Sequence, residues 1–167
     1  MLKIAVCDDE EIFADRIKKL LEKQLINKGI EHKVDVYSSG IELAKLGDAI
    51  SEYRIVFLDI DMEGMNGIQT AEVIRTYSDD IYIAFVTAYI NYAPEGYRCN
   101  AIRYILKNSD QLAASIYECM DAILDKKMDS YEYDVKRNIK APEEIMVTIT
   151  LNEYRDLVSK VATRESA

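Results

Sequence analysis

The sequence lacks any long hydrophobic stretch, and it lacks an excess of positive charge. No apolar run approaches the roughly 18 residues of a membrane-spanning helix, so we expect no membrane association. The 167 residues include 21 lysines and arginines against 30 aspartates and glutamates, which gives a net charge of −9. Because nucleic-acid binding needs clustered basic side chains, we expect no direct nucleic-acid binding by residues 1–127.

Cysteine and histidine are also scarce. The three cysteines, Cys7, Cys99 and Cys119, show no metal-ligand spacing, and His32 is the only histidine. An odd number of cysteines without a signal peptide is typical of proteins kept in a reducing cytosol, so we expect a cytoplasmic location. His32 precedes an apparent strand, and we assign it no role.

The chain is rich in apolar strands that alternate with amphipathic helices. The predicted strands are Leu2–Val6, Val34–Tyr37, Ile55–Leu58, Ile81–Val86 and Ala101–Leu106. The predicted helices are Glu11–Asn27, Ile41–Glu52, Ile68–Tyr77, Asn91–Arg98 and Gln111 to about Lys127. Five strand–helix units joined by right-handed crossovers predict an α/β fold, with a doubly wound, five-stranded parallel sheet in residues 1–127.

The C-terminal part of the chain has a different character. Residues 128–144 are polar and of mixed charge, which indicates a linker. Residues 145–167 contain an alternating apolar run, Ile145–Leu151, and a short amphipathic helix, Glu153–Val161. Neither element can bury its apolar side alone. We therefore expect this strand–helix appendage to pair with a second copy of the chain, which predicts a homodimer.

Polar side chains follow the predicted strands at their C-terminal ends, the edge where parallel sheets bind ligands. Asp8 and Asp9 follow the first strand, Asp59 the third, Thr87 the fourth and Lys107 the fifth. Carboxylates can share Mg²⁺, and a carboxylate held this way can attack phosphorus. A lysine and a hydroxyl can then contact the transferred phosphoryl oxygens. The alternative for the first pair of aspartates is capping of the helix that follows.

Together these residues resemble the receiver domain of bacterial two-component response regulators, over roughly residues 1–127. The matching positions are Asp8–Asp9, Asp59 eight residues before Gly67, Thr87–Ala88, and Tyr104 three residues before Lys107. The resemblance implies a flavodoxin-like, CheY-like fold and a sensor histidine kinase as phosphoryl donor. It also implies a signalling protein rather than an enzyme, with Mg²⁺-dependent chemistry confined to its own phosphorylation and dephosphorylation.

The resemblance assigns a role to each matching residue. Asp59 would be the phosphoacceptor, Lys107 would bind the phosphoryl group, and Thr87 and Tyr104 would form the conformational switch. The implied metal ligands are Asp9 directly, Asp8 through water, Asp59, and the backbone carbonyl of Asp61. Glu10 has no assigned role and is expected to lie on the solvated rim.

Two positions depart from the family pattern, because Glu63 and Asn108 stand where the family often has proline. The segment from Asn91 to Lys107 most resembles receivers of LytTR-class (AgrA-like) regulators, which implies a role in transcription regulation. Those regulators carry a further β-rich DNA-binding domain of about 100 residues, for which residues 128–167 are too short. A truncated LytTR-type regulator is therefore one alternative.

The other alternative comes from the enzyme class. Asp59 and Asp61 form the D-x-D pattern of aspartate-nucleophile phosphatases. In that superfamily the motif ends the first strand and a threonine or valine follows at the fifth position. Here the motif ends the third strand and that position holds Glu63, which disfavours a phosphatase.

Overall fold

The computed structural model describes residues 1–89 and 98–125. Its strands are β1 (Leu2–Cys7), β2 (His32–Tyr37), β3 (Ile55–Leu58), β4 (Tyr82–Thr87) and β5 (Arg103–Leu106). Its helices are α1 (Glu11–Asn27), α2 (Gly40–Ala44), the 3₁₀ helix η1 (Gly47–Glu52), α3 (Gly67–Tyr77) and α5 (Leu112–Leu124). The strands form one parallel sheet in the order β2-β1-β3-β4-β5, which confirms the predicted doubly wound α/β fold.

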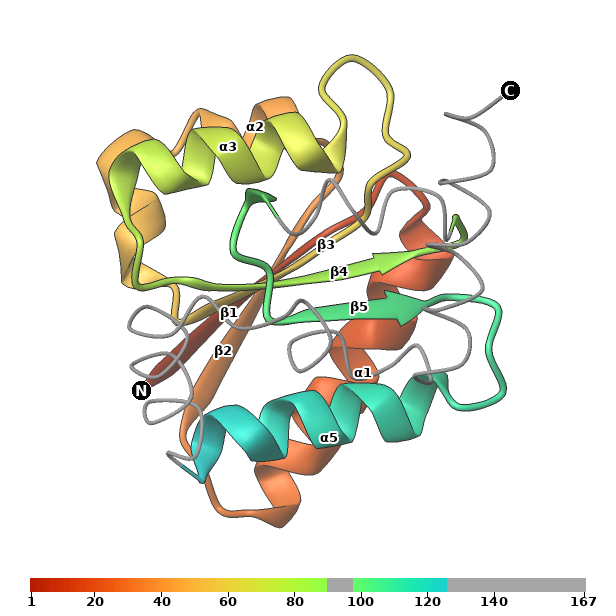
Figure 1. The fold of residues 1–167 in the computed structure, drawn as a ribbon. Helices are drawn as coiled ribbons and strands as arrows, with labels where there is room; N and C mark the ends of the chain where they lie inside the picture. Colours follow the sequence, from red (N-terminus) through yellow and green to blue (C-terminus); the bar gives the residue numbers. More distant parts are fainter. Residues whose placement is uncertain (90–97, 126–167) are drawn as a thin grey trace.

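Helices cover both faces of the sheet. Figure 1 shows α1 and α5 on one face and α2 and α3 on the other. Phe57 and Leu21 belong to the apolar cluster on the α1–α5 side, whereas Phe85 and Tyr104 belong to the cluster on the α2–α3 side. Every residue of β3 and β4 is buried, because consecutive side chains of a central parallel strand enter opposite cores. The first polar side chains after these strands therefore lie at the sheet edge.

Several predicted helix boundaries are corrected by the structure. The predicted helix Ile41–Glu52 is two short helices, α2 and η1, separated near Gly47, which has a positive φ of 54°. A left-handed residue of this kind ends a helix. The last helix, predicted to reach about Lys127, ends at Leu124. The predicted helix Asn91–Arg98 falls almost wholly on residues 90–97, and the predicted linker and tail fall on residues 126–167, all outside the described residues.

The face of α1 that packs against the sheet does not include every apolar residue of the helix. Ala14, Ile17, Leu21 and Leu25 face the core, whereas the side chain of Ile12 is 83% exposed. The buried stripe follows the i, i+3/i+4, i+7 spacing of one helix face, and Ile12 lies off that face.

Gly67, the first residue of α3, lies against the backbone of the loop that follows β3. A Cβ atom at this position would overlap the backbone carbonyl oxygen of Asp59 and lie 2.8 Å from Cα of Ile60. We expect Gly67→Ala to lower the free energy of unfolding by about 3 kcal/mol, because the atoms it meets are backbone atoms. Urea denaturation measures this cost.

The control for this substitution is Gly29→Ala. Gly29 has a φ of 66°, but no heavy atom lies within 4 Å of the added Cβ position. We expect Gly29→Ala to lower the free energy of unfolding by about 1 kcal/mol, the cost of a left-handed backbone at a residue with a side chain. Equal costs for the two variants would contradict a specific close approach at Gly67.

Candidate functional site

The candidate site lies where the C-terminal ends of the central strands meet. Asp8 directly follows β1, Asp59 follows β3, Thr87 ends β4, and Lys107 follows β5. The sheet's hydrogen-bonding pattern continues into these positions, since the amide of Asp59 donates to Cys7 O and the amide of Lys107 donates to Thr87 O, each at 2.9 Å. All four site residues are at most 3% exposed. The sequence analysis predicts these four residues as site residues although they are far apart in the chain, and the structure brings them together.

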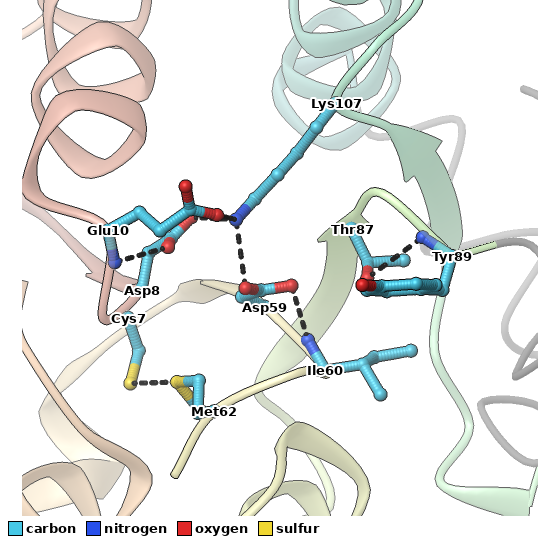
Figure 2. Close-up of polar contacts among 9 residues, drawn as sticks. All are labelled: Cys7, Asp8, Glu10, Asp59, Ile60, Met62, Thr87, Tyr89 and Lys107. Atoms are coloured by element: carbon cyan, nitrogen blue, oxygen red, sulfur yellow. Dashed lines mark hydrogen bonds and ion pairs between the residues drawn. The ribbon is translucent and has the colours of Figure 1, made fainter.

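Lys107 reaches from the β5 end into a group of carboxylates (Figure 2). Its Nζ lies 2.7 Å from Oδ2 of Asp8, 2.8 Å from Oδ2 of Asp59 and 3.3 Å from Oε1 of Glu10. Burial alone would lower the pKa of the Lys107 ammonium, but Asp59 and Asp8 outweigh burial and raise it. The side chain therefore keeps a fixed positive charge across the physiological pH range.

Both oxygens of Asp59 have partners. Oδ1 accepts a hydrogen bond of 2.7 Å from the backbone amide of Ile60, and Oδ2 accepts one from Lys107 (Figure 2). Burial raises the pKa of the Asp59 carboxyl above its usual value, and this effect exceeds the lowering by Lys107, the Ile60 amide and the Thr87 hydroxyl. The carboxyl is a buried group held in one orientation, as a nucleophile requires.

Asp8 is held in a similar way. Its Oδ1 accepts a 2.9 Å hydrogen bond from the backbone amide of Glu10, while its Oδ2 forms the ion pair with Lys107. The N-cap of α1 is Glu10, and no side chain caps that helix end. Asp8 therefore does not act as a simple cap of this helix, which was the alternative interpretation of the sequence. Burial raises the pKa of Asp8 to about 6.

Three carboxylates at this edge have the proximity that a divalent cation needs. Oxygens of Asp8, Glu10 and Asp59 lie within 4.8 Å of one another. Oxygen ligands of this kind suit Mg²⁺. Glu10 was expected on the solvated rim, and its side chain is 59% exposed, yet one of its oxygens joins the cluster.

The remaining predicted ligands lie differently. Asp9 and Asp61 are both exposed, and the cluster of carboxylates contains neither. Their proposed roles, direct ligation by Asp9 and ligation by the backbone carbonyl of Asp61, stay predictions. The signal that could have pointed to Glu10 is its position two residues after Asp8, just before the helix that begins at this edge of the sheet.

The predicted switch pair, Thr87 and Tyr104, is joined by a residue that the sequence did not single out. Both side chains are fully buried. The Tyr104 hydroxyl donates to the backbone carbonyl of Tyr89, and the backbone amide of Tyr89 donates to Oγ1 of Thr87 at 3.4 Å. The ring of Tyr104 also packs against Phe85, with centroids 6.3 Å apart. Tyr89 thus connects the Thr87 hydroxyl beside Asp59 to the ring of Tyr104.

The raised pKa of Asp8 predicts a pH-dependent stability. The folded state holds a proton on Asp8 up to about pH 6, whereas the ordinary carboxyl pKa is 3.8. Between these values the folded state binds more protons, so the free energy of unfolding falls as the pH rises. Above pH 6 the full cost of the buried charge is present, up to roughly 3 kcal/mol for a shift of this size.

The variant Asp8→Asn isolates this effect. At about pH 3 it should match the wild type, because the Asp8 carboxyl is then protonated in both the folded and the unfolded state and is neutral like the amide. At pH 7.5 it should be the more stable protein, by roughly 1–3 kcal/mol. Urea denaturation at both pH values measures the difference, and parallel pH profiles for the two proteins would show that Asp8 titrates normally.

Comparisons with known proteins agree with this geometry. Residues 4–117 match the family described as the response regulator receiver domain, so the chain belongs to that family. The sensory transduction protein LytT of Bacillus anthracis is 32% identical over 143 residues, covering 86% of this chain and 54% of that protein. LytT of Bacillus cereus is 30% identical over 158 residues, covering 92% and 57%. The chain thus spans little more than half the length of these relatives.

Solved structures support the same fold. The receiver domain of AraT from Geobacillus stearothermophilus superposes with a TM-score of 0.63 at 21% identity, covering 78% of this chain and 98% of that one. A response regulator receiver domain protein from Clostridium thermocellum gives 0.61 at 24% identity, covering 77% and 98%. Across residues 1–89 and 98–125, no helix has the length and apolar character to cross a membrane.

Proposed function

We propose that this chain accepts a phosphoryl group on Asp59 from a sensor histidine kinase and changes conformation in response. The observation that carries the proposal is the buried Asp59 carboxylate, oriented by the Ile60 amide and placed 2.8 Å from the Lys107 ammonium at the sheet edge. The family to which the chain belongs supports the same reaction class. In the transfer, an Asp59 oxygen forms a new P–O bond as the P–N bond to the donor histidine breaks.

Mg²⁺ fits the residues present. Asp8 and Asp59 would hold the cation, with Glu10 close by and with Asp9 and the Asp61 carbonyl proposed from the sequence. When bound, the cation would neutralise carboxylate and phosphoryl oxygens that otherwise repel one another. Lys107, whose positive charge now balances these carboxylates, would then contact the phosphoryl oxygens.

The conformational response would begin at Thr87. Its hydroxyl is buried beside Asp59 and accepts a hydrogen bond from the Tyr89 amide (Figure 2). The Tyr89 carbonyl in turn accepts a hydrogen bond from the Tyr104 hydroxyl. A new phosphoryl group competes for the Thr87 hydroxyl and so disturbs both contacts of Tyr89. We propose that this shifts the population between two packings of Tyr104.

The output of this response is inferred from the relatives of the chain. Relatives named sensory transduction protein LytT and transcriptional regulatory protein NatR are longer than this chain, which covers 54% and 53% of them. We propose a role in transcription regulation. The receiver domain would exert it through another domain or through a partner protein. Pairing of two copies through residues 145–167 stays a proposal from the sequence.

The phosphatase alternative gains no support from the site. Its second aspartate, Asp61, is exposed, whereas Asp59 is buried.

A direct test uses a small acyl phosphate as donor. Intact mass spectrometry of the full chain should register one added phosphoryl group in the presence of Mg²⁺ and none in the presence of a chelator. The adduct should be lost on hydroxylamine treatment, because hydroxylamine cleaves acyl phosphates. Failure of the wild type to gain mass with donor and Mg²⁺ would overturn the proposal.

A further inference from the structure

The Lys107 ammonium has one neighbour in the site that carries no charge. Its Nζ lies 4.7 Å from the ring centroid of Phe13, over the ring face. A cation within about 6 Å of an aromatic ring centroid is attracted by the ring, and the attraction grows when water is excluded. The Lys107 side chain is 1% exposed, so the ammonium end of this contact lies away from solvent, whereas Phe13 is partly exposed.

The backbone that carries the ring is held at the start of α1. The amide of Phe13 donates to the Glu10 carbonyl at 2.9 Å, which closes the first turn of the helix. The next residues of the helix face, Ala14 and Ile17, are buried against the sheet. The helix and the core therefore fix the backbone at Phe13, and the partly exposed ring lies over the ammonium from that position.

This uncharged neighbour matters because a divalent cation would compete with Lys107 for its other partners. Asp8, Glu10 and Asp59 hold the ammonium, and the same three carboxylates are close enough together to hold a divalent cation. A cation that takes the carboxylates removes the ion pairs of Lys107 and also repels its charge. The Phe13 ring cannot ligate a hard cation, so it stays available to the ammonium.

We propose that Phe13 is a positioning residue that keeps the Lys107 ammonium beside Asp59 when a divalent cation occupies the carboxylates. The inference rests on the proposed function, since it gives Lys107 a defined place at the moment when phosphoryl oxygens arrive. It predicts that the contact between the ring and the ammonium survives the addition of Mg²⁺.

The first measurement uses NMR of the wild-type chain and needs no phosphorylation. Protons over an aromatic ring are shifted upfield, so the ε-methylene protons of Lys107 should be upfield of those of other lysines. Their signals are assigned from their disappearance in Lys107→Arg. The shift should persist at saturating Mg²⁺. Loss of the shift with Mg²⁺ would mean that Lys107 leaves the ring, which overturns the proposal.

The second measurement uses variants and beryllofluoride, a mimic of the phosphoryl group. Phe13→Leu keeps an apolar side chain but removes the ring, and Phe13→Tyr restores a ring. In the presence of Mg²⁺, the beryllofluoride midpoint should rise about fivefold in Phe13→Leu and return toward wild type in Phe13→Tyr. Ile12→Ala, a change of the exposed neighbouring residue, should leave the midpoint unchanged.

The two measurements separate this inference from the proposed function. Absence of beryllofluoride binding to the wild type would count against the phosphoacceptor role, while the NMR shift would still decide whether the ring holds the ammonium. An unchanged midpoint in Phe13→Leu, with the wild type responding normally, would overturn the positioning role alone. A loss in Phe13→Leu without rescue by Phe13→Tyr would assign the effect to packing and would also overturn it.

Discussion

Asp59→Asn is expected to abolish the gain of phosphoryl mass when the chain is incubated with a small acyl phosphate and Mg²⁺. An amide oxygen is a poor nucleophile and carries no charge to bind a cation, so removal of the carboxylate should slow labelling by orders of magnitude. The substitution preserves shape, because the asparagine oxygen can still accept the Ile60 amide that Asp59 Oδ1 accepts now. Intact mass spectrometry at matched times measures the result.

Loss of labelling must be distinguished from loss of folding. The Asp59 carboxyl has a raised pKa because it is buried, so its neutral replacement should leave the protein at least as stable at neutral pH. Glu63→Gln is a matched control, since it removes one charge from the same loop at an exposed position. That variant should label at the wild-type rate. Equal labelling of wild type and Asp59→Asn would place the acceptor elsewhere.

The strands could be predicted from the sequence because buried parallel strands have continuous apolar runs. Ile55–Leu58 was predicted with the bounds that the structure has, and so was the long helix Glu11–Asn27. Once these strands were assigned, parallel topology alone placed Asp59 and Lys107 at one edge. The convergence of the site is thus a consequence of topology, which a sequence pattern can reveal.

The contacts that the sequence did not reveal depend on side-chain direction and on loop path. Glu10 has an exposed side chain that nevertheless directs one oxygen to Lys107. Tyr89 contributes through its backbone, which no residue pattern marks. The break between α2 and η1 depends on a left-handed backbone at Gly47, and glycine permits that conformation without requiring it.

Lys107→Ala is expected to lower the free energy of unfolding at neutral pH by about 3 kcal/mol, because it leaves buried carboxylates without their cation. Lys107 lowers the pKa values of both Asp8 and Asp59, so its loss raises both values further. The loss of stability should therefore shrink as the pH falls and these carboxyls take up protons. Mg²⁺ should stabilise the variant more than it stabilises the wild type, since the cation no longer competes with the ammonium.

The same variant tests the signalling role of Lys107. The nucleophile remains, so labelling of Asp59 should persist, whereas the change at Tyr89 and Tyr104 that follows labelling should fade. Amide hydrogen exchange at Tyr89 and NMR of the Tyr104 ring measure that change. Lys45→Ala, at an exposed position, serves as the control and should behave as wild type. A full conformational response in labelled Lys107→Ala would contradict the role given to this lysine, because the acyl phosphate would then signal without its buried cation.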